Sequence, residues 1–383
     1  MRFLISAGEA SGELYGAQLI AALKRRVPAS EFFGVGGEQM RAAGCETIVD
    51  SSRLSVVGIT EIVSHLPRIY GDFRRLIAEA DRRQPGAAVV IDSPAFNFRV
   101  AREMHRRRIP VIYYVCPQLW AWRERRVERF HKWIKKALVI FPFEEPWYRE
   151  RGVDAEYVGH PLADLSPPAT TRQEFAAGNG LDPDRPWIAL LPGSRAREVQ
   201  MMLPTLLRAL ERLPADVRRG HEFVLPVASS LSRAWMQEQV ARHSSSEPSP
   251  TIRLVADARP ALIHARAAVV ASGTATVEAA LAGAPMVVVY RVSPLTWRLG
   301  RGLLRVPFVA MPNLIVGRQI VPELLQSGFT AANVAQELET LLADGPAREK
   351  MLSGLAEVRS RLKAGATQPA AERAADAVLR ALS

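Results

Sequence analysis

Cysteine is scarce in this chain of 383 residues, which contains only Cys45 and Cys116. The two lie far apart and have no histidines at metal-ligand spacing, so neither a disulfide framework nor a zinc site is expected. Long apolar runs are also missing, because no stretch approaches the roughly 18 to 20 residues that a membrane-spanning helix needs. Gly8 and Glu9 follow the first apolar run too soon for a signal peptide. We therefore expect a cytoplasmic protein that does not cross a membrane, with no metal and no cofactor.

Acidic residues are also fewer than basic residues. The 39 Asp and Glu residues face 50 Lys and Arg residues, which gives a net charge of +11. Such an excess favours a polyanionic partner, and nucleic acid, an anionic membrane surface and phosphorylated substrates all qualify. No module that reads nucleic acid is recognisable, so nucleic acid is not an expected partner. Apolar residues make up 48% of the chain and charged residues 23%, values typical of globular proteins.

What the chain does have is a repeated alternation of short β-branched runs with longer amphipathic segments. This alternation is typical of an α/β protein with parallel sheets covered by helices on both faces. In the first half, strands are expected at 3–6, 32–35, 88–92, 111–115 and 138–141. After a proline- and threonine-rich stretch the alternation restarts, with strands expected at 187–191, 223–225, 252–255, 268–271 and 286–289. From about Val321 the pattern is helical to the end.

The length exceeds the roughly 250–300 residues at which a single core stops growing, so two doubly wound domains facing a central cleft are expected. We place an N-terminal domain at 1–165, a linker at 166–186 and a C-terminal domain at 187–362. A last helix at 363–383 is expected to pack on the first domain or on a partner subunit. Ligands of such folds bind along the carboxyl ends of the strands, so we place the site there.

Two similar stretches in the second domain predict an anion site. In 189–195 and again in 269–278, an apolar run gives way to small residues and then to a helix, so backbone N–H groups converge on one spot. The candidate binding residues in these stretches are Gly193, Ser194, Arg195, Ser272, Gly273 and Thr274. Arg195 adds a guanidinium suited to phosphate, and Glu278 could accept hydrogen bonds from sugar hydroxyls. The pattern indicates a site for a nucleoside diphosphate.

In the first domain, Asp92 ends a strand just before Pro94 and is our candidate general base. The alternative, that Asp92 caps the following helix, stays open at this point. The small-residue turn 8–12 supplies Glu9, Ser11 and Gly12, and it supports only a generic phosphate or sugar contact.

Aromatic and basic residues gather in 117–126, which includes Gln118 and Trp120, and this mixture fits a membrane interface or a solvated face. A nearby apolar stripe at helical spacing predicts either an interfacial helix that meets membrane or acyl chains, or a helix that faces the core. Its members are Ile62, Val63, Leu66, Ile69, Tyr70 and Phe73. His160, in a Gly-His-Pro turn, is a secondary catalytic candidate or a structural residue. Weaker candidates for phosphate or sugar contacts are Arg291, Asn313 and Glu323.

Seven segments, taken in order, closely resemble the lipid-A-disaccharide synthase family. They are 6–13, 91–97, 117–123, 159–161, 191–195, 272–278 and 312–318. The resemblance implies a GT-B glycosyltransferase of family 19, with Asp92 as the catalytic carboxylate and Arg195, Glu278 and Asn313 in the motifs that hold UDP. In the segment 91–97, Ala95 stands where relatives often carry a second acid, which leaves Asp92 as its only carboxylate.

The same resemblance implies the reaction and the partners. UDP-2,3-diacylglucosamine and 2,3-diacylglucosamine 1-phosphate (lipid X) would give a β(1→6) disaccharide 1-phosphate and UDP with inversion, in lipid A and lipopolysaccharide biosynthesis. The enzyme would sit peripherally on the anionic cytoplasmic face of the inner membrane of a Gram-negative bacterium, and a homodimer stays open. The alternatives are a UDP-sugar epimerase, a transferase with a soluble acceptor, and a lipid carrier without activity.

Overall fold

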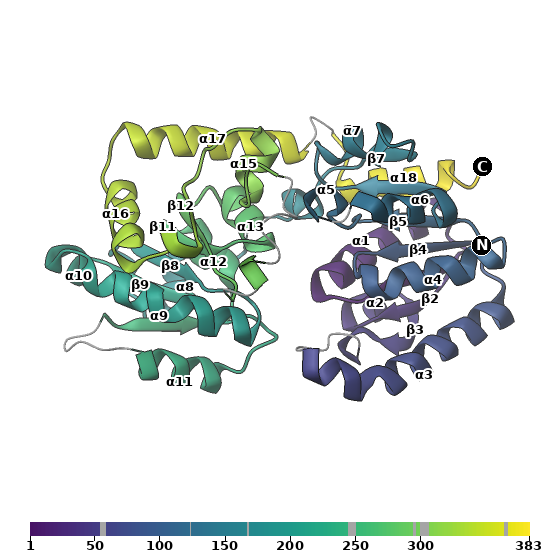
Figure 1. The fold of residues 1–383 in the computed structure, drawn as a ribbon, viewed down its shortest axis with the longest axis horizontal. Coiled ribbons are helices and arrows are strands. Elements are labelled where there is room, and N and C mark those ends of the chain that lie inside the picture. The colour runs from purple at the N-terminus through teal and green to yellow at the C-terminus, as the bar shows by residue number, and fades with distance from the viewer. Residues whose placement is uncertain are drawn as a thin grey trace. The chain divides into compact units, whose positions relative to one another are not determined.

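The computed structural model describes residues 1–53, 59–122, 124–166, 168–243, 250–293, 296–298, 306–363 and 367–383. It consists of two compact units, each built on its own sheet with helices on the sheet faces (Figure 1). Unit 1 comprises Met1–Asp164 and Leu362–Ser383, and unit 2 comprises Leu165–Arg361.

Unit 1 contains a seven-stranded parallel sheet in the order β3-β2-β1-β4-β5-β6-β7. Its strands are β1 (Arg2–Ala7), β2 (Glu31–Gly36), β3 (Cys45–Asp50), β4 (Ala87–Ile91), β5 (Val111–Tyr114), β6 (Lys136–Val139) and β7 (Ala155–Tyr157). The central strands are apolar throughout and buried, as strands covered on both faces must be. All five strands expected in this half are present, and β3 and β7 are additional.

Helices cover both faces of this sheet. They are α1 (Ala10–Arg26), α2 (Glu38–Ala42), α3 (Ile59–Arg83), α4 (Pro94–Arg106), α5 (Leu119–Trp122), α6 (Val127–Trp133), α7 (Glu144–Arg149) and α18 (Ala370–Arg380), with the 3₁₀ turns η1 (Ser51–Arg53), η2 (Glu124–Arg126) and η3 (Pro161–Asp164). Figure 1 shows α18, in yellow, among the elements of unit 1 although it follows unit 2 in the sequence. It packs on α1, where Arg26 pairs with Glu372 and Asp376.

Unit 2 contains a six-stranded parallel sheet in the order β10-β9-β8-β11-β12-β13. Its strands are β8 (Trp187–Leu191), β9 (Glu222–Pro226), β10 (Ile252–Val255), β11 (Ala265–Ala271), β12 (Met286–Tyr290) and β13 (Glu323–Leu325). Its helices are α8 (Arg172–Asn179), α9 (Ala196–Arg212), α10 (Ala215–Gly220), α11 (Arg233–His243), α12 (Ala258–Ile263), α13 (Thr274–Ala282), α15 (Met311–Val316), α16 (Ala331–Leu342) and α17 (Pro346–Lys363), with η4 (Gln326–Gly328). None of the helices described in either unit combines the length and apolarity needed to cross a bilayer.

Two segments of unit 2 differ from the expectation. The chain after Val321 is not helical at once, because Glu323–Leu325 first forms β13 beside β12. The segment 166–186 is more than a linker, because it contains α8, which starts with a capping box between Thr171 and Glu174. Phe175 is buried in one cluster with Trp187, so α8 belongs to the core of unit 2. The spacing of Thr171 and Glu174 was a usable helix signal.

Candidate active site

Each sheet reverses its strand order at one place, between β1 and β4 in unit 1 and between β8 and β11 in unit 2. Ligands of doubly wound sheets bind at the carboxyl ends of the strands on either side of such a switch point. Ala7 pairs with Ile91 at the end of one pair of strands, and Leu191 pairs with Val270 at the end of the other. Within each unit, the two loops that carry candidate residues therefore start next to each other.

The first loop of unit 2 arranges its donors around a carboxylate of its own helix. The Ser194 and Arg195 N–H groups donate to Glu198 Oε2 at 3.1 and 3.3 Å, and Arg195 Nη1 donates to Glu198 Oε1 at 2.9 Å. Gly193 has φ +125°, and a Cβ there would lie 2.7 Å from Glu198 Cβ, so only glycine fits. The Arg195 side chain is 61% exposed. These groups form a donor-rich turn with an exposed arginine at the N-terminus of α9, and Glu198 is a member that the sequence reasoning missed.

The second loop of unit 2 opens α13. Gly273 has φ +144°, and among the described residues beyond its chain neighbours no atom lies within 4 Å of where its Cβ would be. Ser272 Oγ donates to the Val309 carbonyl at 3.0 Å, whereas Thr274 is exposed. Glu278 is half-buried one turn further on, and burial raises the pKa of its carboxyl while Arg259 lowers it. This loop supplies backbone donors and a carboxyl that can accept from hydroxyl groups.

Asn313 and Glu323 form a buried network. The Asn313 Oδ1 accepts from the N–H groups of residues 320–321 at 2.7 and 3.0 Å, and its Nδ2 donates to Glu323 Oε1 at 2.8 Å. Glu323 in turn accepts from the N–H groups of residues 309–310 at 2.9 and 3.0 Å. Asn313 is fully buried, so the structure uses this pair to hold the loop that leads into α15.

Arg291, at the carboxyl end of β12, is also engaged within unit 2. Its guanidinium donates to Thr205 Oγ1 at 3.2 Å and to the Phe329 carbonyl, and it stacks 4.7 Å from the Phe329 ring centroid. Burial lowers the pKa of this guanidinium, and Arg208 adds to the effect. Arg291 therefore ties β12 to neighbouring segments.

In unit 1, the turn after β4 holds Asp92 in an unusual backbone conformation. Asp92 and Ser93 both lie in the left-handed region, with φ +49° and +45°. The fully buried Asn97 maintains the turn, because its Nδ2 donates to the carbonyls of residues 91–92 at 2.9 and 2.8 Å. Tyr113 Oη also donates to the Asp92 carbonyl at 2.8 Å. Such strain persists only where surrounding contacts enforce it, and it gathers at functional sites.

The N-cap position of α4 belongs to Ser93, whose side chain makes no capping hydrogen bond. The neighbouring loop after β1 presents Glu9, an exposed N-cap of α1 without a side-chain capping bond. Ser11 is half-buried and Gly12 is buried, and a Cβ at Gly12 would lie in ordinary van der Waals contact with Ile91. Two carboxylates, Glu9 and Asp92, therefore belong to the switch point of unit 1.

His160 lies inside unit 1 with 1% of its surface exposed. Its ring packs near those of Tyr15 and Phe141, and its Nδ1 accepts from the Leu162 N–H at 3.2 Å. Burial lowers the pKa of His160 to about 3, so the ring is neutral at pH 7. Among the remaining candidates of unit 1, Gln118 is exposed and Trp120 is buried.

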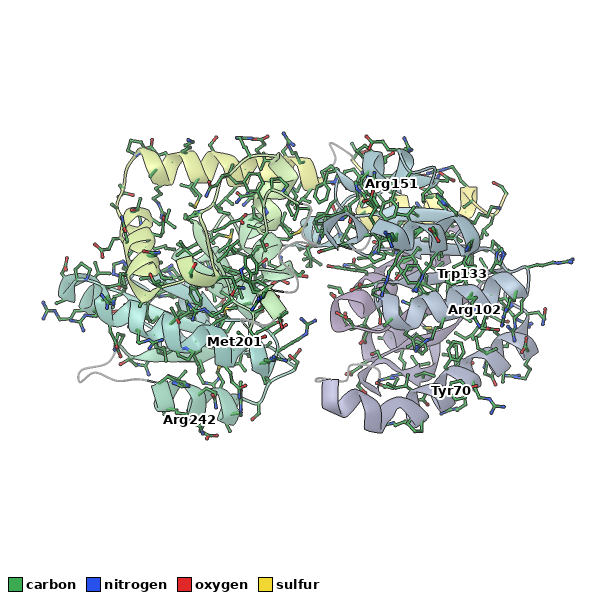
Figure 2. The ribbon with its side chains drawn as sticks, in the orientation of Figure 1. Tyr70, Arg102, Trp133, Arg151, Met201 and Arg242 are labelled. Atoms are coloured by element: carbon green, nitrogen blue, oxygen red, sulfur yellow. The ribbon has the colours of Figure 1, made fainter. Side chains whose placement is uncertain are left out.

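The apolar stripe on α3 is described only in part. The side chains of Ile62, Val63 and Leu66 lie outside the described residues. Ile69 and Phe73 pack against the core of unit 1, whereas Tyr70 is 62% exposed and projects from α3 in Figure 2. The described half of the stripe thus faces the core and leaves one aromatic ring outside.

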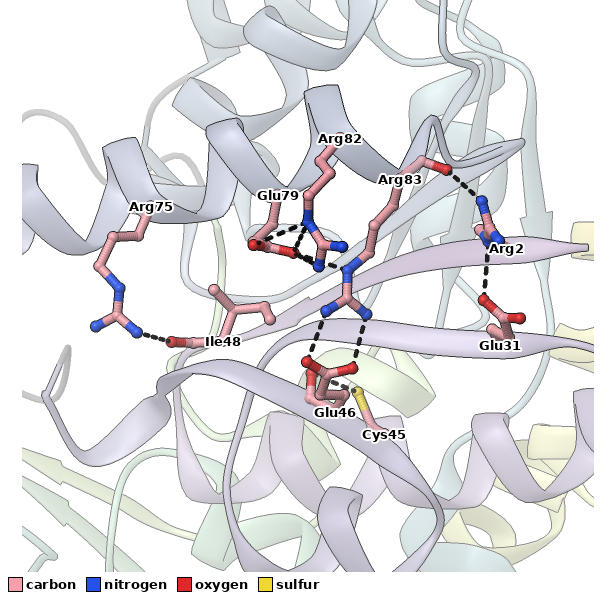
Figure 3. Close-up of polar contacts among 9 residues, drawn as sticks. All are labelled: Arg2, Glu31, Cys45, Glu46, Ile48, Arg75, Glu79, Arg82 and Arg83. Carbon is pink, nitrogen blue, oxygen red and sulfur yellow. Dashed lines mark hydrogen bonds and ion pairs between the residues drawn. The ribbon is translucent and has the colours of Figure 1, made fainter.

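Many basic residues of unit 1 are paired. Figure 3 shows Arg83 between Glu46 and Glu79, at 2.6 and 2.8 Å, and Arg2 with Glu31 at 2.8 Å. Exposed cations without an ion pair among the described residues remain elsewhere in the unit, at Arg74, Arg99, Lys132 and Lys135. Within the described parts of the chain, no cluster of His, Cys, Asp or Glu is arranged to hold a metal ion.

Two doubly wound parallel units, each with candidate loops at its switch point, define the GT-B architecture of glycosyltransferases. The glycotransferase of kitacinnamycin matches with a TM-score of 0.65 at 17% identity, over 100% of this chain and 99% of that chain. A UDP-GlcNAc 2-epimerase from Neisseria meningitidis, bound to UDP-GlcNAc, matches with a TM-score of 0.63 at 12% identity, over 95% of this chain and 100% of that chain. At such identities the likeness shows the fold alone, and the fold does not separate transfer from epimerisation.

The sequence separates them. A family model described as lipid-A-disaccharide synthetase matches residues 3–378. A lipid-A-disaccharide synthase from Koribacter versatilis is 56% identical over 382 residues, covering 99% of this chain and 98% of the relative. One from Myxococcus xanthus is 44% identical over 382 residues, covering 100% and 97%. The chain belongs to the lipid-A-disaccharide synthetase family and is a hexosyltransferase with a GT-B fold.

Proposed function

We propose that this chain joins UDP-2,3-diacylglucosamine to lipid X, which gives the β(1→6) lipid A disaccharide 1-phosphate and UDP. Family membership along nearly the whole chain supports the reaction. The structural observation that supports the mechanism is that each unit has one switch point, which is rich in hydrogen-bond donors in unit 2 and bears a carboxylate in unit 1.

Asp92 acts as the general base in this proposal. Inversion requires a single displacement, so one carboxylate takes the proton from the acceptor 6-hydroxyl as its oxygen attacks the anomeric carbon. Asn97 and Tyr113 hold the Asp92 carbonyl, and burial keeps the pKa of Tyr113 well above its ordinary value, so Tyr113 remains a neutral donor. The fixed turn limits where the base can point. Glu9, Ser11, Gly12, Gln118 and Trp120 would form the acceptor side.

The diphosphate leaves with growing negative charge, which preorganised donors stabilise. Arg195, the N–H groups of residues 193–195 and the start of α13 at 273–274 supply those donors without a metal ion. The departing phosphate competes with the Glu198 carboxylate for the same groups. Glu278 would accept from sugar hydroxyls. Asn313, Glu323 and Arg291 keep the surrounding loops in place, and His160 acts through packing.

The acylated substrates lie in a bilayer, so we propose peripheral binding to the anionic cytoplasmic face of the inner membrane. Tyr70 and the exposed cations of α3, α4 and α6 would supply the contact, each cation contributing about 1 kcal/mol. Binding to phosphatidylglycerol vesicles should weaken between 50 and 500 mM salt and with Tyr70→Glu. Leu352→Glu, at an exposed apolar residue of unit 2, is the matched control. Unchanged binding of Tyr70→Glu would remove this surface from the proposal, and sedimentation velocity would test a homodimer.

The reaction itself has a direct test. The purified protein is incubated in detergent with both substrates and EDTA, and mass spectrometry follows UDP and the phosphorylated disaccharide. Disaccharide formation is the expected result. Product only after addition of a divalent metal would keep the reaction and overturn the metal-free charge stabilisation. No product from a folded protein that still binds UDP would favour an epimerase or a transferase with a soluble acceptor.

A further inference from the structure

A buried carboxyl group in unit 1 has no role in the mechanism above. Glu144, the first residue of α7, is 1% exposed. Its Oε1 accepts from the Trp120 Nε1–H at 3.0 Å, and its Oε2 accepts from the N–H groups of residues 140–141 at 3.3 and 3.1 Å. Residues 140–141 follow β6, and Trp120 belongs to α5, which follows β5. One carboxylate thus joins the loops of two neighbouring strands.

Helix α7 holds the segment 117–122 at a second point. Tyr148 Oη donates to the Pro117 carbonyl at 2.8 Å, and the Trp120 ring packs edge-on against Phe143 at 4.9 Å between centroids. Gln118, between these anchors, is exposed. The segment is therefore fixed from beneath while one polar side chain reaches solvent.

The sheet brings this segment to the strand end that carries the proposed base. Strand β5 pairs with β4, and Tyr114 lies opposite Ile91, the residue before Asp92. Because both strands run in the same direction, the segment 117–122 and the Asp92 turn leave the same edge of the sheet. Any group that orients this segment also shapes the surroundings of Asp92.

Glu144 is the group there that changes charge near neutral pH. Burial raises the pKa of its carboxyl from 4.5 to about 7, so the carboxylate that accepts three N–H donors exists above that pH and gains a proton below it. The ionisable groups that interact with it are neutral between pH 5 and 8, because burial raises the pKa values of Cys116, Tyr148 and Tyr157. The adjacent Glu145 pairs with Arg149. No Lys or Arg among the described residues pairs with Glu144.

We propose that Glu144 is a positioning residue for the sugar acceptor: its carboxylate, through Trp120, holds the segment 117–122 beside Asp92. This inference rests on the proposed transfer reaction. Protonation, or loss of the charge, leaves three N–H donors to share a weaker acceptor, so the segment loosens and the acceptor binds less well. The donor site, built from residues of unit 2, keeps its affinity.

Glu144→Gln tests the proposal with little change in volume. A glutamine amide must place its NH₂ group against at least one of the three N–H donors. We expect the acceptor KM to rise about 10-fold at pH 8, as for loss of one charged hydrogen bond, while the donor KM stays within about twofold. In the wild type the acceptor KM should rise as the pH falls below about 7, and in the variant it should be flat. Glu150→Gln, at a 73% exposed neighbour, is the matched control.

A spectroscopic readout keeps the test independent of turnover. In protein labelled with ¹⁵N-tryptophan, Trp120→Phe assigns the Trp120 indole signal, which should titrate with a midpoint near pH 7 in the wild type and stay fixed in Glu144→Gln. Trp120→Phe should also raise the acceptor KM. This second variant keeps the proposal testable if Glu144→Gln misfolds.

Each outcome has a separate meaning. An active wild type with an unchanged acceptor KM in Glu144→Gln, or a Trp120 signal that does not titrate, would overturn this inference alone. A wild type that forms no disaccharide would overturn the proposed function, and the acceptor role of Glu144 with it. The indole titration would then still report whether Glu144 and Trp120 are coupled.

Discussion

The switch points of the two units share a topology and differ in chemistry. In unit 1 the loops after β1 and β4 carry Glu9 and Asp92, and the second loop is a strained left-handed turn. In unit 2 the loops after β8 and β11 carry Arg195 and two glycines with positive φ that open helices. A doubly wound sheet thus supplies a place for a site. The side chains there differ, which is why we propose proton removal in unit 1 and anion binding in unit 2.

Both units stabilise their loops with one fully buried asparagine. Asn97 bonds the carbonyls of the turn that carries Asp92, and its Oδ1 accepts from Ser6 Oγ at 2.7 Å. Asn313 instead bonds a second polar side chain, Glu323, which holds the loop 309–310. Unit 1 holds the turn of the proposed base through the Asn97 amide and the Tyr113 hydroxyl, whereas unit 2 holds the loop 309–310 through the Asn313–Glu323 pair. We therefore expect substitution of Asn97 to affect kcat more directly than substitution of Asn313.

Asp92→Asn should produce the largest effect. Loss of the general base should lower kcat about 10²- to 10⁴-fold, and UDP affinity should stay the same because the donors for UDP belong to unit 2. Steady-state release of UDP and calorimetric titration with UDP measure the two quantities. Asp81→Asn, at a surface carboxylate paired with Arg107, is the control and should keep full activity. Turnover within a few-fold of the wild type would mean that unit 1 does not supply the base through Asp92.

Arg195→Ala should weaken UDP binding, whereas Asp92→Asn should lower kcat and leave UDP affinity unchanged. Removal of the charged hydrogen bonds of Arg195 should weaken UDP binding about 10- to 100-fold, measured by calorimetry. Arg242→Ala removes an exposed arginine that also pairs with a glutamate of its own helix, Glu238, and Arg242 is labelled in Figure 2. The control should bind UDP normally. If Arg195→Ala and Arg242→Ala bound UDP with equal affinity, Arg195 would not contribute to UDP binding in unit 2.

Asn97→Ala and Asn313→Ala compare the two buried amides. Each leaves buried partners unsatisfied, so each should lower the free energy of unfolding by about 2–3 kcal/mol in urea titrations. Asn97→Ala should lower kcat at unchanged UDP affinity, and Asn313→Ala should weaken UDP binding. If both variants changed the same quantity, either kcat or UDP affinity, the proposed division between catalysis in unit 1 and UDP binding in unit 2 would be wrong.

Gly193→Ala should have the smallest effect. The added Cβ meets Glu198 at a φ that alanine rarely adopts, so we expect a loss of about 1–2 kcal/mol in the free energy of unfolding. Gly178→Ala, within α8 with no atom near its Cβ position, should instead gain about 0.5 kcal/mol. Chemical denaturation measures both. A neutral Gly193→Ala would show that the loop 193–195 tolerates a wider turn than its geometry indicates.

The strands that the sequence did not predict are all at sheet edges. β3 and β7 close the two sides of the first sheet, and β13 closes one side of the second. An edge strand has a neighbour on one side only, and these three are short or only partly buried, so none contains the continuous apolar run that marked the central strands. Their positions depend on pairing with a strand that is distant in sequence. Hydrophobic periodicity carries no information about such pairing.

The same limit applies to the site. The motifs predicted that the turns at 92–94, 193–195 and 272–274 follow the carboxyl ends of strands. The strand order of each sheet then shows that these strands flank the two switch points. The motifs did not distinguish residues that face outward, such as Arg195, from residues that face inward, such as His160 and Asn313. Glu198 and Glu144 escaped notice because each acts through partners that only the folded loops bring within reach.

By itself, the sequence determined the class of fold, the two halves and the family, since these follow from hydrophobic periodicity and from motifs read along the chain. The tertiary structure decided which polar groups are satisfied inside the protein and which remain for a substrate. Burial sets the pKa of Glu144 near 7 and that of His160 near 3, and the buried Asn97 amide holds Asp92 in a left-handed turn. Desolvation and hydrogen-bond partners are properties of packing between distant segments, so they exist only once the chain has folded.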